Sequence, residues 1–169
     1  SSDLACNLRP KAGRASCAAH AAEVGTATRT SVNRHDIWSL PASSSTGIGF
    51  RRRLPSSWNS YKVSVIWVNL GTDSGYVRFQ LGRQEFARSG TALNTGTGQS
   101  VVDVLHDGTT QTTVLTDVAT MSCTADRTQA LYLLRLTNPT DEMTAAIGVG
   151  TLAMCPMNST RLVTCHSPR

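Results

Sequence analysis

The chain has 169 residues, of which 40% are hydrophobic and only 16% charged, and its formal net charge is +5. This length suits one folded domain plus a tail of a few dozen residues, and a second domain is not expected. No apolar run approaches the roughly 18 residues of a membrane-spanning helix, and the start lacks the hydrophobic segment of a signal peptide, so we expect neither a membrane protein nor export by that route.

Residues 1 to about 30, within an expected arm that covers residues 1–35, differ in character from the rest, being rich in alanine and poor in large apolar side chains. Such a segment has too little apolar surface to fold by itself. We expect an N-terminal arm that becomes ordered against a partner, with a floppy tail as the alternative. Residues 31–46 are expected to form a hinge-like segment in which Trp38 covers one end of the core.

From Gly47 onward the apolar residues recur with a period of two, which is typical of β-strands. The clearest case is Tyr76–Leu81, where Val77, Phe79 and Leu81 face the core. The predicted strands, in chain order, are Ile48–Leu54, Tyr61–Leu70, Tyr76–Leu81, Gln99–His106, Thr112–Met121, Leu131–Asn138, Met143–Ala153 and Arg161–Cys165. About eight antiparallel strands without a helix predict an all-β jelly-roll sandwich over residues 36–169.

The run Arg51, Arg52 and Arg53 is the one cluster among otherwise scattered arginines. In a strand Arg52 points with Ile48 and Leu54 towards the apolar side, where a guanidinium is costly unless it is paired. We therefore expect Arg52 to meet a carboxylate, with these candidates: Asp103, Asp117 and Asp141. The three arginines and Trp38 are the candidate assembly residues. Without an aromatic platform beside the arginines, binding to nucleic acid is not expected.

The five cysteines are Cys6, Cys17, Cys123, Cys155 and Cys165. They include no C-x-x-C pair, so we expect no metal site and no cofactor. Buried or free thiols of a reducing compartment are expected, and a Cys6–Cys17 disulfide stays open.

No catalytic constellation is visible. His35–Asp36 and His106–Asp107 are adjacent pairs whose members point in opposite directions when extended. Asp141–Glu142 is the one acidic doublet and is typical of a solvated corner, whereas glycoside hydrolysis needs paired acids in a cleft. We therefore do not expect an enzyme.

Several motifs occur in a particular order along the chain. Trp58 precedes the strand Val63–Trp67, which is followed by Gly75–Phe79, and Leu131–Arg135 precedes a corner at Asp141. Over about residues 36–155 this order resembles the jelly-roll module of tailed-bacteriophage virion proteins. The resemblance implies a structural protein located in the virion, made in the host cytoplasm, that forms homotrimers and docks on the major capsid protein or a tail component.

A chain consisting of an arm and one jelly roll favours the capsid-decoration or head-fibre type over a spike. The alternative is a receptor-binding tip of a tail fibre or spike that recognises host surface glycans, but the loops 71–75 and 90–98 contain no aromatic residue. A capsid-forming jelly roll that contacts nucleic acid would need a more basic arm. A carbohydrate-binding module would need an aromatic strip on one sheet face, and an aromatic content of 5% leaves little for one.

Overall fold

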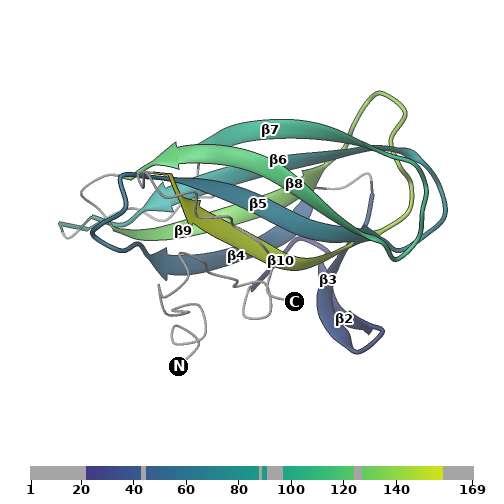
Figure 1. The fold of residues 1–169 in the computed structure, drawn as a ribbon, viewed down its shortest axis with the longest axis horizontal. Coiled ribbons are helices and arrows are strands. Elements are labelled where there is room, and N and C mark those ends of the chain that lie inside the picture. Colours follow the sequence, from purple (N-terminus) through teal and green to yellow (C-terminus); the bar gives the residue numbers. More distant parts are fainter. Residues whose placement is uncertain (1–21, 43–44, 88, 91–96, 124–126, 158–169) are drawn as a thin grey trace.

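A computed structural model describes residues 22–42, 45–87, 89–90, 97–123 and 127–157 of the chain. Ten β-strands lie within these ranges (Figure 1). They are β1 Ala22–Val24, β2 Thr28–Val32, β3 His35–Leu40, β4 Thr46–Arg53, β5 Ser60–Asn69, β6 Gly75–Glu85, β7 Thr97–His106, β8 Thr113–Ser122, β9 Thr128–Leu136 and β10 Ile147–Pro156.

The strands form two five-stranded sheets in which all paired strands are antiparallel. The first sheet has the order β1-β4-β9-β6-β7, and the second sheet has the order β2-β3-β10-β5-β8. Consecutive strands mostly alternate between the sheets, which stack face to face (Figure 1). The expectation of an all-β jelly-roll sandwich is confirmed.

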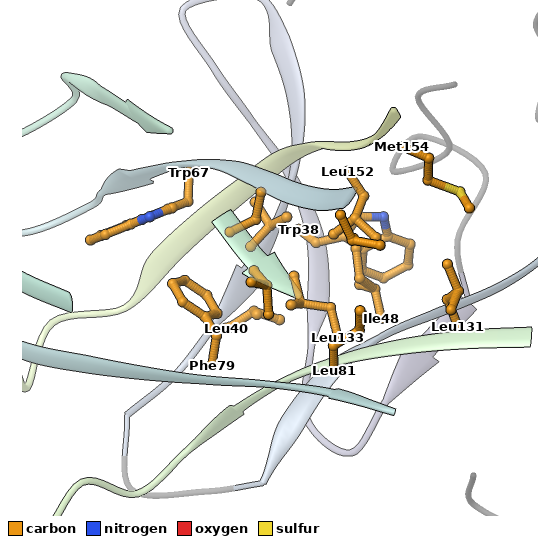
Figure 2. Packing of buried hydrophobic residues seen from close by; sticks show 14 of the residues in the cluster. Trp38, Leu40, Ile48, Trp67, Phe79, Leu81, Leu131, Leu133, Leu152 and Met154 are labelled. Atoms are coloured by element: carbon orange, nitrogen blue, oxygen red, sulfur yellow. The ribbon is translucent and has the colours of Figure 1, made fainter. Parts of the chain in front are cut away.

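Alternating side chains of both sheets fill the space between them (Figure 2). Val77, Phe79 and Leu81 of β6 are fully buried, as the period of two predicts. Trp67 of β5 packs edge-on against Phe79, with 5.6 Å between the ring centroids, and its Nε1–H donates to Oγ1 of Thr116 at 2.9 Å. A buried tryptophan is stable here because its polar atom has a partner.

The segment before residue 46 differs from the expectation of an arm and a hinge. β1 pairs with β4 from residue 22 onward, and β2 and β3 form a hairpin, so the expected boundary at residue 35 cuts through that hairpin. Sequence periodicity misses β2 because it is an edge strand whose first four residues are all exposed. The remaining residues of the expected arm, and the predicted strand Arg161–Cys165, lie outside the described residues.

Arg135 of β9 is a fully buried guanidinium in the core. Its Nη1 donates to the carbonyl oxygens of Leu40 at 3.0 Å and Ala145 at 2.7 Å, and its Nη2 donates to that of Met143 at 2.5 Å. Burial lowers the pKa of this guanidinium, and the nearby charges of Glu142 and Asp73 oppose that shift. The side chain ties the end of β3 to the segment between β9 and β10.

Asp73 makes a second link to the same segment from the loop between β5 and β6. Its carboxylate accepts hydrogen bonds from the backbone N–H of Thr144 at 2.5 Å, the hydroxyl of Thr144 at 2.9 Å and the N–H of Ala145 at 3.0 Å. Burial on its own raises the pKa of Asp73, but the hydrogen bonds from Ala145 and Thr144 outweigh it, and the pKa lies below its ordinary value. The link is therefore made by the charged carboxylate.

We expect this link to make the protein sensitive to acid. Because the folded pKa is depressed, the contribution of Asp73 to stability is complete above the unfolded pKa of about 3.9 and is lost as pH falls through the folded pKa. Urea unfolding between pH 7 and pH 3 should show that Asp73→Asn is less stable at neutral pH and loses less stability below about pH 4 than the wild type does. Asp36→Asn, which removes an exposed carboxylate on β3, is the matched control. Identical acid slopes for Asp73→Asn and the wild type would contradict this role.

Candidate functional site

The outer face of the first sheet carries partly exposed aromatic side chains. Five aromatic residues belong to the core, namely Trp38, Trp58, Tyr61, Trp67 and Phe79. By contrast, Tyr76, Phe86 and Tyr132 are partly exposed. Tyr76 lies on β6, Phe86 directly follows β6, and Tyr132 lies on β9. We call the outward side of β4, β9, β6 and β7 the platform face. Aromatic rings kept at the surface are typical of binding surfaces, since they offer a large apolar area with little flexibility.

Tyr132 has glycine on both sides. The strand register pairs it with Gly49 of β4 and with Gly82 of β6. A Cβ atom at Gly49 would lie 2.8 Å from Cδ1 of Tyr132, so the ring lies over the β4 backbone at this position. Leu134, the next outward residue of β9, lies between Gly47 and Gln80 in the register. The platform face thus presents a planar ring and an apolar side chain with few large neighbours.

Polar groups adjoin this apolar centre on β6 and β7. Arg78 donates from Nε to Oδ1 of Asp103 at 2.7 Å and from Nη2 to Oδ2 at 2.8 Å, a bidentate pair across the two strands. These bonds lower the pKa of Asp103 and raise that of Arg78, so both groups stay charged at neutral pH. Gln80 points to the same side, and its amide has no hydrogen bond to another described residue. The face therefore offers an amide near the Tyr132 ring and a fixed ion pair further along the same strands.

The arginine run contributes two cations to the platform face and one to the interior. Arg51 and Arg53 are exposed, whereas Arg52 is only 7% exposed. The guanidinium carbon of Arg51 lies 5.2 Å from the centroid of the Phe86 ring, within the range of a cation–π contact. The predicted alternation of this strand is confirmed, because Arg52 points inward with Ile48 and Leu54.

The structure separates the other candidate residues from this face. Two of the proposed acidic partners of Arg52 bind elsewhere, since Asp103 pairs with Arg78 and Asp117 with Lys62. Trp38 is 6% exposed and belongs to the core cluster, so it offers almost no surface to a partner. A role of Trp38 in assembly stays a prediction. A role of the arginines in assembly stays a prediction.

The expectation that an aromatic content of 5% leaves little for an aromatic strip stays a prediction. The fold places Tyr76 and Tyr132 on the first sheet and Phe86 directly after β6, and all three are partly exposed. The alternation of β9 did contain a signal, because Leu131 and Leu133 face inward and Tyr132 and Leu134 therefore face outward. The glycines beside Tyr132 could not be found from the sequence, since they depend on the register of three strands.

The described part of the chain gives little sign of other chemistry. Among these residues no group of three or more histidines, cysteines or acids could hold a metal ion, and no helix is long and apolar enough to cross a membrane. Cys123 is a free thiol, whereas Cys155 is disulfide-bonded. The expectation of free thiols is wrong at Cys155. Cys6, Cys17 and Cys165 lie outside the described residues.

No protein-family model matches the sequence, and no curated protein matches it. Solved structures with the same architecture do match. A family 35 carbohydrate-binding module from Clostridium thermocellum has a TM-score of 0.55 at 15% identity, over 83% of this chain and 95% of the module. The CBM22-1 xylan-binding domain of Paenibacillus barcinonensis Xyn10C has a TM-score of 0.50 at 11% identity, over 83% and 87% of the two chains.

Larger proteins match over one of their parts. The Arthrobacter globiformis T6 isomalto-dextranase gives a TM-score of 0.56 at 19% identity, over 83% of this chain and 22% of the enzyme. The chain also spans 28% of the length of an exo-β-1,3-galactanase from Phanerochaete chrysosporium. At these identities the likeness establishes the fold alone.

Proposed function

We propose that this chain is a non-catalytic module that binds glycans through the platform face, with Tyr132 as the central contact. The observation that carries the proposal is the placement of Tyr132 between Gly49 and Gly82, with the amide of Gln80 as a diagonal neighbour. The bidentate Arg78–Asp103 pair lies further along β6 and β7 on the same face. A sugar ring has an apolar side of C–H groups and an edge of hydroxyl groups. The electron-rich face of an aromatic ring attracts the former, and fixed amide and charged groups bind the latter.

Binding without cleavage fits the chemistry of this face. Hydrolysis of a glycosidic bond requires two carboxyl groups on either side of the bond. Asp103 lies on the platform face, but both of its oxygens are bound by Arg78. A carboxylate held in that way is a poor general acid or nucleophile, because its pKa is lowered and its oxygens are occupied.

The fold neighbours and the cysteine chemistry support the same proposal. The family 35 and CBM22-1 modules share this architecture over almost their whole length, and a sandwich of this kind can therefore serve as a separate binding unit. Disulfides persist in oxidising compartments, so the disulfide at Cys155 favours a place of action outside the cytoplasm. Extracellular glycans are found there.

The phage virion role stays a prediction. Val101, Leu105 and Leu115 are more than half exposed and lie on the edge strands β7 and β8. A homotrimer would gain about 25 cal/mol for each Å² of such apolar surface that it removed from water. The glycan-binding alternative, in which the module recognises host surface glycans, uses the platform face proposed here and does not depend on the trimer.

The test is a glycan-binding measurement with a matched pair of variants. The full chain is screened against soluble polysaccharides that include xylan, an α-glucan and a β-1,3-galactan, and the ligands found are measured by calorimetry. Tyr132→Ala should weaken binding about five- to tenfold, since loss of a stacking ring costs about 1–1.5 kcal/mol. Leu115→Ala, which removes an exposed apolar side chain from the outer side of the second sheet, should leave the affinity unchanged. Binding that survives Tyr132→Ala undiminished would refute the proposed site.

A further inference from the structure

One end of the platform face carries two neighbouring positive charges. Arg51 and Arg53 are both exposed and point to the same side of β4. Four other cations of the described residues form ion pairs, namely Arg29–Asp36, Lys62–Asp117, Arg78–Asp103 and Arg83–Glu85. Arg34, on the β2–β3 hairpin, is also exposed without an ion pair to a described residue. Neither Arg51 nor Arg53 forms an ion pair with a described residue.

These two cations lie next to the proposed sugar-stacking residue. Tyr132 is paired with Gly49, and Arg51 is two residues further along β4, so the two side chains are diagonal neighbours about 7–8 Å apart. The residues opposite Arg51 and Arg53 on β9 are small, namely Ala130 and Thr128. A ligand that stacks on Tyr132 and continues along β4 would therefore reach both guanidinium groups.

The contact of Arg51 with Phe86 orients its guanidinium group in a way that favours binding of an anion. The Phe86 ring lies 5.2 Å from its guanidinium carbon and restricts the orientation of the group. Contact with the ring face leaves the N–H edge of the guanidinium available, and that edge matches a carboxylate or sulfate. Arg51 and Arg53 are separated by two residues of strand, roughly 7 Å, so their mutual repulsion decreases when an anion binds between them.

We propose that the glycan bound by the platform face is anionic, and that Arg51 and Arg53 bind its carboxylate or sulfate groups while Tyr132 stacks on a sugar ring. This inference rests on the proposed function and adds the chemical class of the ligand. The net charge of +5 is consistent with an anionic partner. Polynucleotides are also anionic, but the hydrogen-bonding groups and the single central ring of this face suit a sugar better than a run of stacked bases.

The experiment compares a polyuronate with its methyl ester, which has the same backbone without the charge. The wild-type chain should bind the polyuronate at least tenfold more tightly than the ester at low salt, and the preference should shrink as salt is raised. Arg51→Gln combined with Arg53→Gln should remove the preference and leave binding of the ester unchanged. Arg29→Gln combined with Arg34→Gln removes the same net charge from the exposed β2–β3 hairpin and should keep the preference.

Three outcomes would overturn the inference. The first is equal affinity of the wild-type chain for the polyuronate and its ester. The second is that the Arg29 and Arg34 double variant loses the preference for the polyuronate as fully as the Arg51 and Arg53 double variant does. The third is that a single-stranded oligonucleotide binds more tightly than the polyuronate and that this binding depends on Arg51 and Arg53. Because the comparison of polyuronate with ester uses the wild-type protein, it does not depend on the folding of any variant. Failure of the proposed function would look different, since neither the ester nor any neutral polysaccharide would then show binding that Tyr132→Ala weakens.

Discussion

Replacement of Arg135 by methionine is expected to lower the free energy of unfolding by about 3–5 kcal/mol, because it leaves three buried carbonyl oxygens without their hydrogen-bond donor. Arg135 is fully buried, and its guanidinium satisfies the carbonyl oxygens of Leu40, Ala145 and Met143. Methionine fills a similar space but donates no hydrogen bond. Each carbonyl left buried without a partner costs about 1–3 kcal/mol.

The loss of local stability should be largest in the segments that Arg135 connects, which are distant from each other in sequence. Leu40 ends β3, and the two other acceptors lie in the segment between β9 and β10. Chemical denaturation gives the free energy, and hydrogen exchange should show faster exchange of that segment and of the end of β3. Arg135→Lys should be intermediate, since one ammonium group cannot replace a planar fork that contacts three acceptors.

Arg53→Met is the matched control for this change. It makes the same substitution at an exposed position of β4 and should alter the free energy of unfolding by about 0.5 kcal/mol or less. If Arg135→Met stayed within 1 kcal/mol of the wild type, the guanidinium would not hold the two segments together.

The sequence already contained the signal for Arg135. In the strand Leu131–Leu136, inward residues alternate with outward ones, and the arginine occupies an inward position after Leu131 and Leu133. The same alternation correctly predicted the buried residues of β6 and the inward direction of Arg52. What alternation could not supply was the partner, because backbone carbonyls of distant loops leave no trace in the sequence.

Predictions from the sequence failed where burial is weak. β1 has three residues, and the first four residues of β2 are exposed, so neither strand shows an apolar period. Their place in the sheets depends on pairing with β4 and β3. The platform face was missed for a related reason, since Tyr132, Gly49 and Gly82 come from three strands that are neighbours only once the register is set.

Two glycines of β4 allow the effect of a substitution on stability to be distinguished from its effect on glycan binding. At Gly47 a Cβ atom would lie 1.9 Å from the carbonyl oxygen of Leu133 and 2.8 Å from Cα of Leu134, both of which are backbone atoms of β9. At Gly49 it would meet only atoms of the Tyr132 ring within 3.0 Å. The obstacle at Gly47 is a hydrogen-bonded strand, whereas the obstacle at Gly49 is a side chain that can rotate.

We therefore expect Gly47→Ala to lower the free energy of unfolding by several kcal/mol, because β4 and β9 must move apart to admit the methyl group. Moving two paired strands apart should cost more than overpacking a core with side chains, which costs about 1–3 kcal/mol. Gly49→Ala should fold with a loss of about 1 kcal/mol or less. It should nevertheless weaken glycan binding several-fold, since it displaces the ring of Tyr132. Thermal unfolding followed by circular dichroism measures the first effect, and calorimetry with the polysaccharide ligand measures the second.

Gly148→Ala provides the control on the other sheet, where the added methyl group would meet the flexible end of Ile37 at 2.4 Å. It should resemble Gly49→Ala in stability and the wild type in glycan affinity, because it lies away from the platform face. A Gly47→Ala protein as stable as the wild type would show that the close approach of β4 and β9 is not required by the fold. Equal affinities for Gly49→Ala and Gly148→Ala would instead mean that the position of the Tyr132 ring does not determine binding, and the proposed site would then have to lie elsewhere on the sandwich.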